Sequence, residues 1–142
     1  MSTVAAILQR KNRSPVAVES SSPVIKALQI MSEQNIGSVI VMDNHEYKGI
    51  MTERDYSRKV ILKEKDSAST KVGEIMSTNL PVIAPTDRIE HCMQLMTTNN
   101  IRYMPVFDNG KFSGVISMSD VVKETILMQK ETINHLQSYI NS

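Results

Sequence analysis

The feature that most constrains the fold of this 142-residue chain is an internal repeat with an offset of 65 residues. The segment NIGSVIVMDNHEYKGIMTERD, residues 35–55, aligns without a gap with NIRYMPVFDNGKFSGVISMSD, residues 100–120. The identical positions in the first copy are Asn35, Ile36, Val41, Asp43, Asn44, Gly49 and Asp55. A repeat of this length predicts two copies of one supersecondary unit.

The hydrophobic period changes in the same order within each repeat. An extended segment is followed by a helix with an apolar stripe, two β-branched runs joined by turn residues, and a second helix. The expected ranges are 16–18, 24–31, 38–42, 47–51 and 52 onward in the first repeat, and 82–84, 89–96, 103–107, 112–116 and 117 onward in the second. Each repeat therefore reads β-α-β-β-α, with the polar residues 63–71 as a linker.

Composition excludes several classes of protein. The 16 Lys and Arg balance 15 Asp and Glu, and no basic run with interleaved aromatics occurs, so nucleic acid is not expected as the main partner. The single cysteine, Cys92, excludes an intramolecular disulfide and fits a reducing compartment. No signal peptide and no run of eighteen apolar residues can be recognised. We expect a soluble, cytoplasmic protein without a membrane partner.

The repeated motif [ST]-x-x-D allows two interpretations. Thr52 with Asp55, and Ser117 with Asp120, each stand at the start of a predicted helix. In a capping box the hydroxyl accepts from a backbone N–H three residues on, and the carboxylate accepts from the N–H of the cap. A helix N-terminus also attracts anions, so the same residues can face a phosphate. The spacing alone leaves both uses open.

The tandem unit, with D-x-x-x-x-x-G-h-h-[ST]-x-x-D in each copy (h apolar), strongly resembles the cystathionine-beta-synthase (CBS) domain pair, or Bateman module. The resemblance covers residues from about 7 to 125 and is strongest to small stand-alone bacterial CBS-pair proteins. It implies an α+β fold of two repeats packed with pseudo-two-fold symmetry, sheets face to face and helices outside. The implied boundaries are 7–65, 72–128 and a C-terminal helical extension, 129–142.

The resemblance also implies two clefts, each built from both repeats. In such clefts the aspartate accepts from the ribose hydroxyls, and the Ser or Thr lies beside the ribose and phosphate. One site would combine Val16, Ile36, Gly37 and Ser38 with Ser117 and Asp120. The other would combine Pro81, Ile101, Arg102 and Tyr103 with Thr52, Arg54 and Asp55. Arg102 replaces Gly37, so the two clefts are expected to differ in charge.

The function implied by the resemblance is regulatory binding of an adenosine ligand: AMP, ADP or ATP, with NAD(H) or S-adenosylmethionine as alternatives. A structural dimerisation module with non-binding clefts is the second hypothesis. An enzyme is the least favoured, because no acid, base and nucleophile converge in the sequence, and neither a catalytic cofactor nor a metal site is expected. An unidentified effector protein would carry the output.

The second helices hold more apolar residues than one small pair should bury, which predicts a homodimer. These residues are Tyr56, Val60, Ile61, Val121, Val122, Ile126 and Leu127. The tail from Lys130 to Ser142 is expected to continue as an amphipathic helix, with Ile133, Leu136 and Ile140 facing a neighbour.

Overall fold

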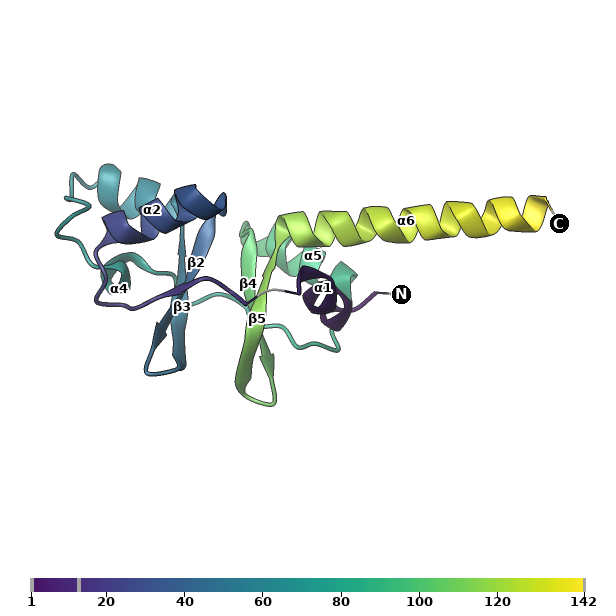
Figure 1. Cartoon of the computed structure of the whole chain (residues 1–142), viewed down its shortest axis with the longest axis horizontal. Coiled ribbons are helices and arrows are strands. Elements are labelled where there is room, and N and C mark those ends of the chain that lie inside the picture. The colour runs from purple at the N-terminus through teal and green to yellow at the C-terminus, as the bar shows by residue number, and fades with distance from the viewer. Residues whose placement is uncertain (1, 13, 142) are drawn as a thin grey trace. The chain divides into compact units, whose positions relative to one another are not determined.

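A computed structural model describes residues 2–12 and 14–141 of the chain (Figure 1). These residues form two compact units. The first-repeat unit holds residues 14–80, and the second-repeat unit holds residues 2–12 together with 81–141. None of the helices in these described ranges is both long enough and apolar enough to cross a bilayer.

The first-repeat unit contains a three-stranded sheet in the order β1-β2-β3. Strand β1 pairs parallel with β2, and β2 pairs antiparallel with β3. Its elements are β1 (Ala17–Val18), α2 (Val24–Gln34), β2 (Ser38–Asp43), β3 (Glu46–Thr52), α3 (Glu53–Tyr56), the π-helical turn η1 (Ser57–Ile61) and α4 (Val72–Ile75). The predicted order of strands and helices in this repeat is confirmed, with a π-helical turn continuing the short second helix.

The second-repeat unit repeats the arrangement around a two-stranded antiparallel sheet. Its elements are α1 (Val4–Lys11), α5 (Ile89–Asn99), β4 (Tyr103–Asp108), β5 (Lys111–Ser117) and α6 (Met118–Ile140). The extended segment expected at 82–84 is reduced to one parallel bridge between Ile83 and Val106. The C-terminal tail continues as a helix, as expected, because α6 runs without a break as far as Ile140.

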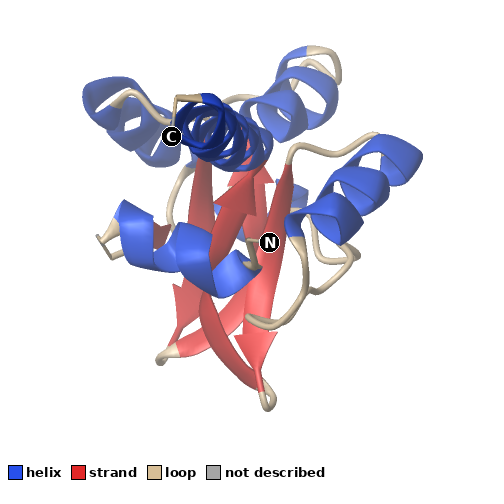
Figure 2. Ribbon diagram, turned by 90° about the vertical axis from the view of Figure 1, so that its right-hand side faces the viewer, coloured by secondary structure: helices blue, strands red, loops and turns tan. Residues whose placement is uncertain are grey.

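Each hairpin closes through a two-residue turn in the left-handed region (Figure 2). Asn44 and His45 have φ values of 51° and 67°, and Asn109 and Gly110 have 50° and 81°. Positive φ at both central positions is the type I′ pattern, whose twist matches that of the strands. Both hairpins also shift register at the same place, after Val41 and after Val106, so the repeat extends to the irregularities of the backbone.

The short helix before each repeat packs on the other repeat. In the second-repeat unit, Val4 N donates to Asp87 O at 2.9 Å. In the first-repeat unit, Val72 N donates to Ser22 O, the equivalent carbonyl, at 2.8 Å. The compact units therefore consist of residues 14–80 and of residues 2–12 with 81–141, because α1 and α4 bury their apolar residues against the other repeat. The repeat boundaries 7–65 and 72–128 stay a prediction.

Each unit has its own apolar core. That of the first-repeat unit consists of Val18, Val24, Ala27, Met31, Val39, Val41, Met51, Val60, Val72 and Ile75. That of the second-repeat unit consists of Val4, Ile7, Ile83, Ile89, Cys92, Met96, Met104, Val106, Ile116 and Val121. Val60 and Val121, counted above among the residues in excess of one pair's core, are fully buried in these cores, whereas Ile61 and Ile126 are exposed.

Candidate functional site

Both [ST]-x-x-D motifs form complete capping boxes at the N-termini of α3 and α6. Asp55 N donates to Thr52 Oγ1 at 3.1 Å, and Thr52 N donates to Asp55 Oδ2 at 2.9 Å. The second motif has the same geometry between Ser117 and Asp120, at 3.1 Å and 2.9 Å. The predicted helix starts are confirmed. In both motifs one carboxylate oxygen serves the cap, and the surroundings of the other oxygen distinguish the two sites.

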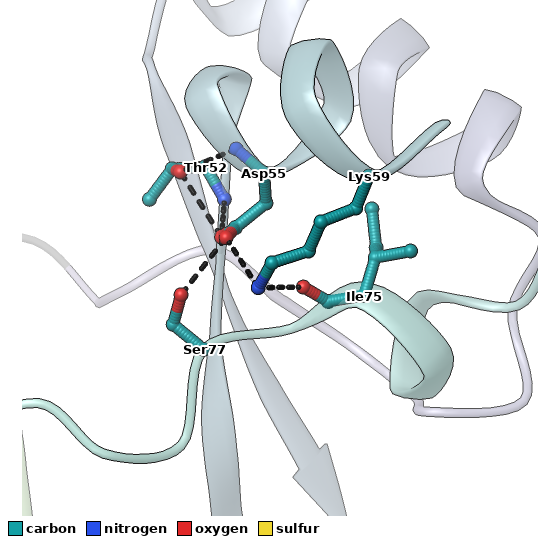
Figure 3. A network of polar contacts seen from close by, with 5 residues as sticks. All are labelled: Thr52, Asp55, Lys59, Ile75 and Ser77. Carbon is teal, nitrogen blue, oxygen red and sulfur yellow. Dashed lines mark hydrogen bonds and ion pairs between the residues drawn. The ribbon is translucent and has the colours of Figure 1, made fainter. Parts of the chain in front are cut away.

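The Asp55 carboxylate is enclosed by donors from its own unit (Figure 3). Its Oδ2 also accepts from the Thr52 hydroxyl at 3.0 Å. Its Oδ1 accepts from Ser77 Oγ and forms an ion pair with Lys59 Nζ, both at 2.9 Å. The side chain of Asp55 is only 7% exposed, and Lys59 is further fixed by donating to Ile75 O at 2.9 Å. Both oxygens of this carboxylate are therefore engaged by the fold.

The Asp120 carboxylate has a more open environment. Its Oδ2 accepts from the cap and forms an ion pair with Lys11 Nζ at 3.0 Å, while Lys11 also donates to Val115 O at 2.9 Å. The two bonds described here for Asp120, from Ser117 N and from Lys11 Nζ, both go to Oδ2. The Asp120 side chain is 14% exposed, twice the exposure of Asp55. A ligand hydroxyl that donates to Oδ1 would therefore leave both of these bonds in place.

Glu124 explains why the lysine that pairs with the motif aspartate lies on η1 in the first repeat and on α1 in the second. This residue was not among those predicted from the sequence. It stands on α6 at the position that Lys59 occupies in the first repeat, 65 residues earlier. Glu124 is buried and accepts from Ser2 Oγ at 2.7 Å and from Arg10 Nε at 2.8 Å. A carboxylate at this position cannot pair with Asp120, so the cation comes from α1 instead. Comparing charges at equivalent positions of the repeat would have revealed the exchange.

The other predicted residues lie next to the motif of their own unit. Gly37 O accepts from Glu53 N at 3.2 Å, and Arg102 O accepts from Met118 N at 2.8 Å. Ser38 pairs with Thr52 across the hairpin, as Tyr103 pairs with Ser117. In both units the segment that enters the hairpin therefore runs beside the start of the motif helix.

The remaining predicted residues differ in their exposure to solvent. The half-buried ones are Val16, Ile36, Arg54, Pro81 and Ile101, whereas Arg102 is exposed. Val16 O accepts from Ile40 N at 2.9 Å and so joins the first-repeat sheet. The expected combination of Val16, Ile36, Gly37 and Ser38 with Ser117 and Asp120 draws on both units and stays a prediction, as does its counterpart with Thr52 and Asp55.

No second reactive centre is evident in the part of the chain that the structure describes. Cys92 lies fully buried in the second-repeat core, and burial raises the pKa of its thiol to about 11. A raised pKa keeps the thiol protonated, which opposes a nucleophilic role. Among the described residues, no group of three His, Cys, Asp or Glu side chains could hold a metal ion.

Comparison with known proteins identifies the class to which this fold and its paired motifs belong. A sequence model of the CBS domain matches residues 4–61 and 72–126. The chain belongs to the CBS domain family, as a tandem pair, and is built as a CBS-pair regulatory module. The resemblance found in the sequence and the expected α+β fold are both confirmed.

Individual relatives cover most of the chain. The mitochondrial CBS domain-containing protein CBSX3 of Arabidopsis thaliana is 33% identical over 97% of this chain and 71% of its own length. A protein with CBS domains from Burkholderia ambifaria is 40% identical with a TM-score of 0.84, covering 89% of this chain and 95% of that one. The CBS domain pair of protein MJ0100, solved with 5′-methylthioadenosine and S-adenosyl-L-methionine, is 23% identical with a TM-score of 0.74, covering 88% and 96%.

Proposed function

We propose that this protein is a regulatory sensor that binds an adenosine ligand, AMP, ADP or ATP in the first instance, through the motif of Ser117 and Asp120. The observation that carries the proposal is that Asp120, at the N-terminus of a 23-residue helix, is more exposed than Asp55 and holds both its cap bond and its ion pair on Oδ2. A ribose presents two adjacent hydroxyl donors, and an ionised carboxylate oxygen is a strong acceptor for them.

The surroundings of Asp120 suit the rest of a nucleotide. The positive end of the α6 dipole favours a phosphate near the first turn. Lys11, whose side chain is 31% exposed, adds a cation that can rotate from Asp120 toward a phosphate. In the first repeat, Thr52 and Asp55 could contact a ligand hydroxyl only by releasing Ser77 or Lys59. We therefore assign the stronger binding to the Asp120 motif and the weaker to the Asp55 motif.

The choice among adenosine ligands depends on charge. Lys11 and the α6 N-terminus are the positive elements beside Asp120, and both favour a phosphate-bearing ligand over an adenosyl ligand that has no phosphate. One structural neighbour was solved with S-adenosyl-L-methionine and 5′-methylthioadenosine, which supports adenosyl ligands without a phosphate as the alternatives. NAD(H) and S-adenosylmethionine thus remain the alternative ligands of the same motif.

We infer a role in regulation rather than catalysis, with output through a homodimer and an effector protein. Each motif is followed by an exposed Ile-Leu pair at equivalent positions, Ile61-Leu62 at the end of η1 and Ile126-Leu127 on α6. Side chains of this kind on the helices that carry the motifs would link a ligand to contacts with another chain. A ligand shifts the equilibrium between a state that makes these contacts and one that does not, and only by the difference in its affinity for the two states.

The experiment has two steps. Freshly purified protein is denatured, and the small molecules that it releases are identified by mass spectrometry. The melting temperature is then measured with and without each adenosine ligand. The proposal predicts a shift with AMP, ADP or ATP that Asp120→Asn removes. A ligand at about a hundred times its Kd should stabilise the protein by about 2.7 kcal/mol. An empty protein with no shift for any adenosine ligand would favour the structural alternative, which the complete capping boxes already support.

A further inference from the structure

Helix α6 carries two apolar stripes on different faces. The first stripe contains Val121 and Met128, and with Glu124 between them it packs into the second-repeat unit. The second, which we call the outer seam, lies about 100° around the helix, as the 3.6-residue period requires. It consists of the exposed residues Val122, Ile126, Ile133, Leu136 and Ile140.

The outer seam continues where the unit ends. All residues from 129 to 141 are exposed, and Figure 1 shows α6 running past α1 and α5, the helices beside it in its unit. Twelve residues of helix span about 18 Å. A free helix of this length is marginal in water, and its stability normally comes from burying an apolar face. Within the described chain nothing covers this face.

We propose that the outer seam pairs with the same seam of a second copy of this chain, as a parallel two-stranded coiled coil. From Val122 to Ile140 the seam advances by steps of 4, 3, 4, 3 and 4 residues when Gln129 is included. That is the heptad spacing of the a and d positions, which suits helix pairing rather than a broad apolar surface.

Polar residues select the parallel direction. A parallel pair in register places Gln129 opposite Gln129 of the partner copy, where each side-chain amide can donate to the other. An antiparallel pair that matches Val122 with Ile140 places Gln129 opposite Ile133 and leaves the amide without a partner. The antiparallel register also brings two copies of Lys130 together, whereas the parallel one sets Lys130 near the partner's Thr125.

The first test measures the mass of the full chain by light scattering across a concentration series. The dimer has a mass of about 32 kDa, twice 15.9 kDa. Ile133→Asp with Leu136→Asp should raise the dimer Kd at least about 30-fold, because two charges would be buried in each seam. The matched control, Asn134→Asp with Ser138→Asp, adds the same charge on the opposite face of the same exposed segment and should leave the Kd unchanged.

The second test fixes the direction. Cys92 is buried, so Gln129→Cys provides the accessible thiol. Mild oxidation should give a covalent dimer from Gln129→Cys alone in the parallel arrangement. If only the double variant Ile126→Cys with Leu136→Cys crosslinks, the pair is antiparallel and the proposed geometry is wrong.

The remaining outcomes separate this proposal from its rivals and from the proposed ligand. A monomeric wild type, or a dimer that survives the seam substitutions, overturns the seam pairing. A monomer that binds vesicles of phosphatidylcholine and phosphatidylserine would overturn it in favour of a membrane surface. The adenosine-induced thermal shift should persist in the seam variant, so loss of the dimer and loss of ligand binding are distinguishable results.

Discussion

The sharpest difference between the two motifs should appear in their stability without any ligand. Asp55 and Asp120 are equivalent in the [ST]-x-x-D pattern, and replacing a partner that only completes a capping box by Asn costs well under about 1 kcal/mol. The structure distinguishes them. Asp55 is buried and accepts from donors at both oxygens, whereas Asp120 is partly exposed and holds its cap bond and its ion pair on Oδ2.

The magnitude follows from the bonds that an asparagine cannot reproduce. In Asp55→Asn the amide oxygen can still serve Thr52 N, but the NH2 group then faces Ser77 Oγ and Lys59 Nζ. Losing a charge-assisted bond in a buried place costs about 1.5–3 kcal/mol. The exposure of Lys59, 44% of its side chain, places the value toward the lower end, at about 2 kcal/mol.

For Asp120→Asn the corresponding loss is smaller. The amide oxygen can keep the bond from Ser117 N, and the NH2 group then takes the Oδ1 position, away from the cap. Only the ion pair with Lys11 is weakened, and partly exposed pairs contribute at most about 1 kcal/mol. We therefore expect the free energy of unfolding to fall by about 1–2 kcal/mol more in Asp55→Asn than in Asp120→Asn.

Urea unfolding of ligand-free wild type and both variants, followed by circular dichroism, measures this difference. Thermal scans should agree, with a melting temperature about 3–10 °C lower for Asp55→Asn than for Asp120→Asn in a domain of this size. Ser77→Ala is the control, because it removes one donor to Asp55 and leaves the capping box intact. Equal losses in the two aspartate variants would refute the assignment of Asp55 as the enclosed carboxylate.

Three further outcomes are expected. Asp120→Asn should abolish most of the AMP- or ATP-induced thermal shift, while Asp55→Asn keeps most of it; the reverse order would contradict the assignment of the sites. Gly49→Ala should lower the free energy of unfolding in urea by about 1–3 kcal/mol, because its Cβ would stand 2.7 Å from Ser77 O. Gly110→Asn, at a left-handed position with open space around it, should leave that free energy nearly unchanged. Burial raises the pKa of Cys92 from 9 to about 11, so the thiol loses its proton at a lower pH in the unfolded chain than in the folded protein. The free energy of unfolding should therefore be constant below pH 9 and fall by up to about 3 kcal/mol as the pH rises from 9 toward about 11. Cys92→Ala should not show this fall.

Much of the fold could be predicted because the identities between the repeats sit where the backbone demands a particular residue. Asn35 and Asn100 end α2 and α5 in the left-handed conformation, with φ of 54° and 53°. Asparagine tolerates this region better than most residues. Asn44 and Asn109 do the same in the hairpin turns. A repeated asparagine therefore marks a chain reversal, which is why the order of elements could be predicted from one sequence.

The parts that could not be predicted depend on contacts between segments distant in the chain. Asp87 and Glu90 have the spacing of a capping box at the start of α5, yet Asp87 Oδ2 accepts from Ala84 N in the preceding turn. The first N–H of α5, on Ile89, instead donates to Ser2 O, from the segment before the first repeat. Spacing within one helix cannot reveal a partner some eighty-seven positions away along the sequence.

The same limit explains why two motifs of one pattern differ in their availability to a ligand. Lys59 lies four residues after Asp55, so its ion pair belongs to one helix and closes the first motif with Ser77. In the second repeat Glu124 takes that position, and the cation on Asp120 comes from α1. Helix α1 is thereby held to α6 at two points, by Lys11 on Asp120 and by Arg10 on Glu124. A ligand that takes Lys11 from Asp120 weakens one of them, and so acts on the attachment of α1 to the helix that carries the outer seam.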